Sequence, residues 1–224
     1  MKTKLDEEEK GLLRKILRAQ AYRQMMSANM RGHGLKYLFD SQGRLGLVQD
    51  IQHVLNQVNR VQELYTSIGG GDIRHEASVR MERIPYPTTR FDLATFLATS
   101  GPAESLAMET YTNSKWEEFA QVARDDLAYE REATKRGTNF FHEFAADKSQ
   151  RPLVRQVLHR WMAICLLSLG RPGSAGDRRA LELGLRDSSV SDSSKAYLEM
   201  LAPMMKLAGL SKEKLREAGV QLPE

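Results

Sequence analysis

The sequence predicts an all-α protein built as a bundle of long helices. Apolar residues recur at spacings of three and four over most of the chain, and no segment alternates convincingly between apolar and polar residues. The chain has 224 residues, of which 41% are hydrophobic and 28% charged, a composition typical of globular proteins with a sizeable core. A single domain spanning residues 1–224 is therefore expected.

The first two predicted helices form an antiparallel hairpin. The first helix covers residues 5–39, and its apolar stripe becomes polar at Gln20 and Gln24. A turn at residues 40–43 leads to the second helix, residues 44–68, where valine, isoleucine and leucine again repeat at helical spacing. This pattern places a polar patch inside the buried face of the first helix.

A long connection follows the second helix. Three glycines at residues 69–71 end that helix, and residues 72–90 lead to the next one, with Pro85 and Pro87 enforcing an extended backbone. Simple helical hairpins need only a few residues at such a point, whereas bundles of the ferritin type use a long crossover. The connection therefore favours a ferritin-like four-helix bundle.

Two more helices complete the core bundle, which spans about residues 5–145. The third covers residues 91–112 and is expected to kink or break near Ser100, because Gly101 and Pro102 follow. The fourth covers residues 114–144.

Additional C-terminal helices are expected within about residues 150–212. They cover residues 150–169 and 193–208, and a region rich in glycine, arginine and serine separates them. A kink is expected at Pro203.

Charge, cysteine content and motifs exclude several classes of function. The net charge is +4, but lysine and arginine are dispersed among acidic residues, so a nucleic-acid partner is not expected. The acidic N-terminus lacks the features of a signal peptide and no apolar run reaches the length of a membrane span, which predicts a cytoplasmic protein without membrane contact. Cys165 lies in an apolar run and is expected to be buried and inert. Phosphate-loop, nucleophile-elbow and cysteine-zinc motifs are absent from the sequence.

One pair of motifs has the spacing of metal ligands. Di-iron carboxylate bundles use one Glu from each of two helices and a Glu-x-x-His pair from each of two others, because a spacing of three puts both side chains on one helical face. The second predicted helix contains Asp50 and His53 at this spacing, and the fourth contains Asp126 and Tyr129. The first pair keeps the geometry with a shorter acid, while the second keeps only the carboxylate.

Several collinear blocks resemble a known family. They are Val48-Gln49-Asp50 followed by His53, Tyr86-Pro87-Thr88, Arg124-Asp125-Asp126 before Tyr129, His159-Arg160-Trp161, and the stretch from Leu198-Glu199-Met200 to Gly209-Leu210. Together they span about residues 44–212 and resemble the ferritin-like phenylacetate catabolism family, the large and structural subunits of the phenylacetyl-CoA ring-epoxidising monooxygenase. The resemblance implies a ferritin-like fold and membership of a multicomponent oxygenase for aromatic degradation.

The resemblance also implies where metal ligands would stand. They fall on Gln20 or Gln24, Asp50, His53, Ser100, Asp126 and Tyr129. Neutral groups replace two of the carboxylates and one histidine, so the implied di-iron site is degenerate. Asp50, His53 and Asp126 remain as candidate metal residues, with Glu104 and Glu130 as candidate substitutes.

Two functional hypotheses follow from the sequence. In the first, the chain is an oxygenase subunit, with iron or with a purely structural role, that acts on an aromatic acyl-CoA and assembles with a second ferritin-like subunit or with itself. The alternative is a non-enzymatic, metal-free helical scaffold or binding protein, whose centre is filled by hydrogen bonds of Gln20, Gln24, Ser100 and Tyr129.

Overall fold

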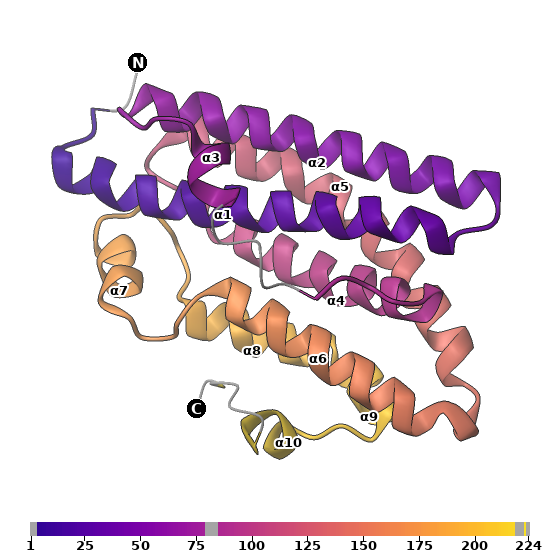
Figure 1. Cartoon of the computed structure of the whole chain (residues 1–224). Helices are drawn as coiled ribbons and strands as arrows, with labels where there is room; N and C mark the ends of the chain where they lie inside the picture. Colours follow the sequence, from indigo (N-terminus) through magenta and orange to yellow (C-terminus); the bar gives the residue numbers. More distant parts are fainter. Residues whose placement is uncertain (1–3, 79–84, 218–221, 223–224) are drawn as a thin grey trace.

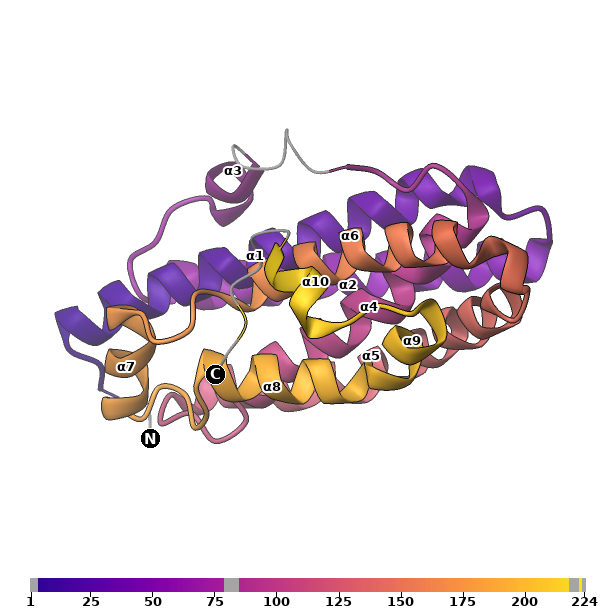
Figure 2. The same cartoon turned by 90° about the horizontal axis from the view of Figure 1, so that it is seen from below.

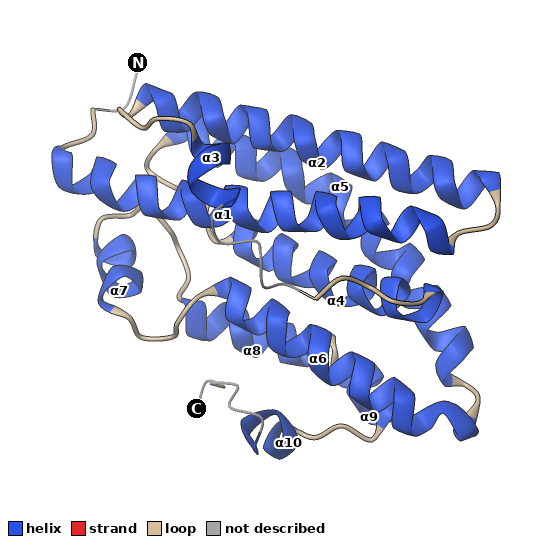
Figure 3. Cartoon of the chain, in the orientation of Figure 1, coloured by secondary structure: helices blue, strands red, loops and turns tan. Residues whose placement is uncertain are grey.

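A computed structural model describes residues 4–78, 85–217 and 222, without the side chains of residues 78, 128–133 and 136. Every regular element in the described residues is a helix (Figure 3), which confirms the all-α prediction. None of the described helices is both long enough and apolar enough to cross a membrane.

Four long helices form two antiparallel hairpins (Figure 1). They are α1 (Glu7–Gly34), α2 (Ser41–Ser67), α4 (Arg90–Glu109) and α5 (Glu117–Ala145), and α1 packs mainly on α2 while α4 packs mainly on α5. Side-chain caps start three of them. Asp6 caps α1 by accepting from the backbone N–H of Glu9 over 2.8 Å, and Asp40 and Thr89 cap α2 and α4 in the same way. These boundaries agree with the predicted helices to within a few residues.

The C-terminal helices cover one side of α4 (Figures 1 and 2). α6 (Arg151–Leu169) packs on α4, and α8 (Val190–Met200) and α9 (Ala202–Ala208) pack on α6; the short α10 (Lys212–Glu217) ends the described chain apart from residue 222. The single helix predicted for residues 193–208 is thus two helices. Pro203 cannot continue α8 because it lacks a backbone N–H and its ring clashes with the preceding turn.

Two short helices were not predicted. The connection after α2 contains α3 (Ile73–Ser78), where the side-chain oxygen of Gln62 accepts from the backbone N–H of Ile73 over 2.8 Å. The region between α6 and α8 contains α7 (Ala175–Glu182), which Ser174 caps. Both helices are too short for a hydrophobic repeat to be visible, and both depend on contacts from elsewhere in the chain. Residues 79–84 of the predicted connection lie outside the described residues.

A kink or break was predicted near Ser100, and of the two a break does not occur, because α4 continues from Arg90 through Pro102 to Glu109. α4 packs against α1, α5, α6 and α8, and nearly all of its middle turns are buried. The tertiary contacts therefore outweigh the loss of one backbone hydrogen bond at Pro102.

Close packing of α4 on α5 depends on Gly137. A β-carbon at this position would lie 2.6 Å from the backbone nitrogen of Ala98 and 2.9 Å from the carbonyl carbon of Leu97. Because backbone atoms cannot rotate away, we expect Gly137→Ala to lower the free energy of unfolding by about 1–3 kcal/mol.

The matched control for this substitution is Gly11→Ala in α1, where a β-carbon would meet nothing within 4 Å. It should raise the free energy of unfolding by about 0.4–1 kcal/mol. Urea denaturation followed by circular dichroism measures both variants, and equal stability of Gly137→Ala and the wild type would contradict the close contact.

Candidate functional site

The middle of the four-helix bundle holds a hydrogen-bonded group of side chains from α1, α2 and α5. Nε2 of His53 lies 3.3 Å from Oδ1 of Asp126, and Nε2 of Gln24 donates to Oδ2 of Asp126 over 3.5 Å. Nε2 of Gln57 lies 3.5 Å from Nε2 of His53. We call these four residues, Gln24, His53, Gln57 and Asp126, the central polar cluster. Two predicted site residues, His53 and Asp126, thus meet although they are 73 positions apart.

A buried polar stripe on α1 leads into this cluster. Gln20, Gln24, Ser27 and Arg31 follow each other at spacings of four, three and four, which places them on one helical face. All four are at most 3% exposed. The sequence indicated the stripe at Gln20 and Gln24 but not its continuation at Arg31, since arginine is rarely fully buried. The regular spacing of four, three and four residues was the sequence feature that could have indicated the burial of Arg31.

A second arginine of α1 is buried beside the stripe. Arg23 donates to the side-chain oxygen of Gln20 and, over 3.0 Å, to the backbone carbonyl of Ser168 on α6. Burial lowers the pKa of Arg23, and the nearby Tyr111 and Glu104 partly offset this effect. An arginine remains protonated at neutral pH even so, and α1 therefore carries positive charge into the interior.

Asp50 lies at the inner wall of a cleft at one end of the bundle. The cleft has a volume of about 380 Å³, and Asp50 is only 3% exposed. Its walls come from the start of α2, the start of α4 and the end of α5. They combine the apolar side chains of Leu38, Leu47, Leu93, Ala94, Leu97 and Phe140 with the polar or charged ones of Asp40, Gln42, Asp50 and Arg90. The guanidinium of Arg90 lies over the ring of Phe140, 4.5 Å from its centre. A cleft of this size, with apolar walls and a few polar groups, suits a small ligand that has both apolar and polar parts.

The remaining predicted site residues lie on α4 and α5. Ser100 and Glu104 are 2% and 6% exposed, so both point into the interior. Tyr129 and Glu130 belong to α5, but their side chains lie outside the described part of the structure. Cys165 is buried, and burial raises the pKa of its thiol to about 12, as expected for an inert core cysteine.

The described donor set does not fit a di-iron centre. Such a centre takes carboxylates from all four helices and histidines from two, whereas the described cluster offers one carboxylate, one imidazole and two amides. Both oxygens of Asp126 already face hydrogen-bonding partners, Gln24 and His53. Among the described residues, no group of three or more His, Cys, Asp or Glu side chains is placed to hold a metal ion.

The amide oxygens of the central polar cluster do not replace the missing carboxylates of a di-iron centre. The side-chain oxygens of Gln24 and Gln57 are buried and accept no hydrogen bond in the described structure. A neutral amide oxygen can contact a cation, but it contributes no negative charge against two iron ions. The cluster therefore has the character of a polar core rather than of a charged metal cage.

No protein-family model matches the chain, and no curated protein sequence matches it. The family suggested by the sequence blocks remains a prediction.

Proposed function

We propose that the chain is a ferritin-like subunit with a structural, metal-free role in a multicomponent oxygenase of the phenylacetyl-CoA-epoxidising type. The observation that carries this proposal is the central polar cluster. His53 and Gln24 occupy both oxygens of Asp126 at the position where the resemblance implies a metal. Hydrogen bonds join α1, α2 and α5 in the interior. In a catalytic subunit, iron would join the corresponding helices.

The arrangement of the helices supports the ferritin-like part of the proposal. α1 and α2 form one antiparallel hairpin, α4 and α5 form another, and a long connection containing α3 joins the two. Polar side chains from α1, α2 and α5 meet at similar depth between the hairpins, and the α4 residues Ser100 and Glu104 are buried as well. Ferritin-like bundles likewise have one long crossover connection and polar side chains that project inward from all four helices.

Buried arginines support the metal-free role in this proposal. Asp50, Glu104 and Asp126 are acidic groups buried in the interior, and burying unbalanced negative charge is costly. Arg23 and Arg31 are buried on α1. Cationic side chains thus bring positive charge into an interior where a di-iron protein would use its metal ions.

The iron content of the purified chain tests the proposal. After expression in iron-supplemented medium, we expect no stoichiometric iron by elemental analysis, and His53→Ala should leave the value unchanged. A di-iron protein produced in the same medium serves as the positive control. Two iron ions per chain, lost on His53→Ala, would refute the metal-free role.

A second measurement separates the structural subunit from a stand-alone scaffold. Co-expression with a catalytic ferritin-like subunit of the proposed oxygenase type should yield a stable complex on affinity purification and gel filtration. If the chain contains no iron and no complex forms, the scaffold hypothesis replaces the oxygenase-subunit hypothesis.

A further inference from the structure

The outer face of α2 exposes large aliphatic side chains in a regular row. Leu45, Val48 and Leu55 are 63%, 47% and 46% exposed. Together with Gln52 and Asn59 they repeat at spacings of three, four, three and four, the pattern by which one helix packs against another in a coiled coil. We call the five residues Leu45, Val48, Gln52, Leu55 and Asn59 the α2 seam.

The seam lies opposite the side of α2 that packs in the bundle. Leu47, Val54, Val58 and Val61 are at most 3% exposed and fill the core, while the seam residues project from the other side. α2 runs along an outer edge of the molecule (Figure 1). The side chains of α2 that hydrogen-bond to α3 are Gln62 and Tyr65, which lie after the end of the seam. In the described structure the seam is therefore uncovered.

This face carries no charge. Between Leu45 and Asn59 the exposed positions of α2 are all aliphatic or amide side chains, namely Leu45, Val48, Gln49, Gln52, Leu55, Asn56 and Asn59. A solvated helix face in a chain with 28% charged residues would normally include lysine or glutamate. Depletion of charge together with exposed aliphatic groups is characteristic of the centre of a protein interface.

We propose that the α2 seam joins two copies of this chain through an antiparallel, two-fold symmetric helix pair. In such a pair Leu45 faces Leu55 of the partner subunit, and Val48 faces Gln52 of the partner subunit. The same contacts repeat on the other side of the axis, because the spacings between Leu45, Val48, Gln52 and Leu55, which are three, four and three residues, are the same from either end.

Charge and shape favour a second copy as the occupant. Two identical faces repel each other when they carry net charge, but the seam has none to bring together. Phe39, which is 83% exposed, precedes the start of α2 and adds apolar surface beyond that end of the seam. The inference goes beyond the proposed function and does not depend on iron content or on a catalytic partner.

The test compares the full chain with Val48→Glu/Leu55→Glu. Sedimentation equilibrium should give the wild type twice the chain mass of 25.4 kDa, and the variant the mass of one chain. Each introduced carboxylate would then be buried against the partner subunit's Leu45 or the partner subunit's Gln52 without a counter-charge, which prevents pairing. Both positions are solvent-exposed in the single chain, so circular dichroism should show an unchanged fold.

A matched control places the same chemical change elsewhere. Leu167 and Met200 are 69% and 52% exposed on α6 and α8, and Leu167→Glu/Met200→Glu should remain dimeric. A wild type that stays monomeric at the highest soluble concentration would overturn the proposal, including the case in which it binds a different protein through α2. A dimer that persists in Val48→Glu/Leu55→Glu would overturn it as well.

Discussion

Replacing Asp92 by alanine is expected to lower the free energy of unfolding by about 3–5 kcal/mol. Asp92 is 1% exposed and joins the start of α4 to α6. Its carboxylate accepts from the indole N–H of Trp161 over 2.5 Å, from the backbone N–H of Thr88 over 2.8 Å, and from the guanidinium of Arg160. Without the carboxylate, the Trp161 N–H loses its partner in the core and Arg160 loses its counter-charge. Urea denaturation at neutral pH measures the effect.

The isosteric control is Asp92→Asn, which keeps the volume and removes the charge. It should cost less than Asp92→Ala, about 1–3 kcal/mol, because one amide oxygen can still accept hydrogen bonds. A loss within the error of the measurement for both variants would show that the network does not stabilise the fold.

Asp92 also makes the free energy of unfolding depend on pH. Burial alone would raise the pKa of Asp92, but hydrogen bonds from Arg160, Thr88 and Trp161 outweigh it and hold the pKa below its ordinary value of 3.8. A carboxyl whose pKa is lower in the folded state stabilises the fold fully above its unfolded pKa, and this contribution is lost as the pH falls through the folded pKa. The free energy of unfolding of the wild type should therefore fall more steeply than that of Asp92→Asn below about pH 5.

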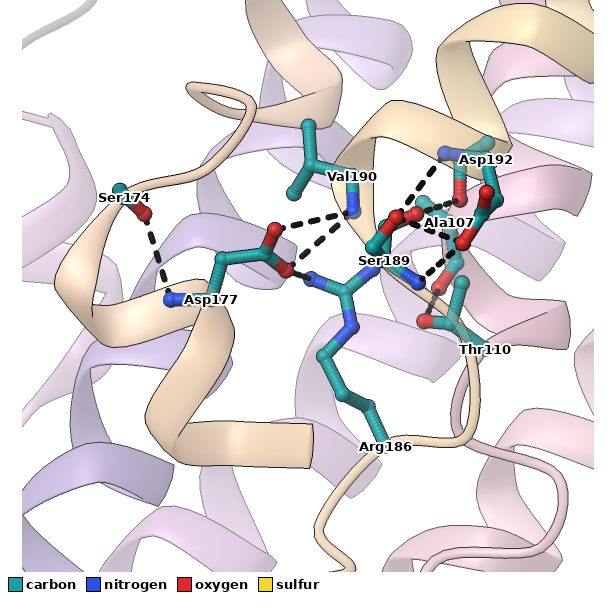
Figure 4. A network of polar contacts seen from close by, with 9 residues as sticks. Ala107, Thr110, Ser174, Asp177, Arg186, Ser189, Val190 and Asp192 are labelled. Carbon is teal, nitrogen blue, oxygen red and sulfur yellow. Dashed lines mark hydrogen bonds and ion pairs between the residues drawn. The ribbon is translucent and has the colours of Figure 1, made fainter. Parts of the chain in front are cut away.

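Asp177→Ala should also cost about 3–5 kcal/mol, because it leaves a buried arginine unpaired. Asp177 accepts from the guanidinium of Arg186 over 2.8 Å and from the backbone N–H of Val190, the first residue of α8, over 3.2 Å (Figure 4). Arg186 is 9% exposed, and its guanidinium lies over the ring of Tyr111, 5.6 Å from the centre. One carboxylate therefore joins α7 to the start of α8, and urea denaturation again measures its loss.

A double-mutant cycle isolates the ion pair. Arg186→Met removes the charge but keeps apolar contact with Tyr111, so the double variant with Asp177→Ala should be less destabilised than the sum of the two single variants. Strictly additive losses would mean that Asp177 and Arg186 act independently. Protease cleavage between α6 and α8 should become faster in Asp177→Ala, since α7 loses this connection.

The long helices could be predicted because their signals are local. α1, α2, α5 and α6 repeat apolar residues over many turns, and Asp6 and Asp40 cap the starts of α1 and α2. The short helices α3 and α7 could not be predicted in this way. The amide of Gln62 and the carboxylate of Asp177 help to hold them, and these contacts exist only after the chain has folded.

The candidate site was predictable in part for the same reason. The spacing of Asp50 and His53 placed both on one turn of α2, and the hairpin pattern placed Asp126 at a corresponding depth. Arg31 shares the helical spacing of Gln20 and Gln24, but nothing local distinguished Arg23 from a surface arginine, or Gln57 from other polar residues of α2. Their burial results from which faces of α1 and α2 pack toward the rest of the bundle.

The amino-acid sequence by itself determined an all-helical bundle, its main helices and the polar interruption of their buried faces, because helical periodicity is encoded within each segment. Only the tertiary structure decided that α4 continues through Pro102, that His53 and Gln24 meet at Asp126, and that Arg23 is buried near Glu104. Those outcomes depend on pairing between distant helices, where desolvation and hydrogen bonding together determine whether a polar side chain can remain inside.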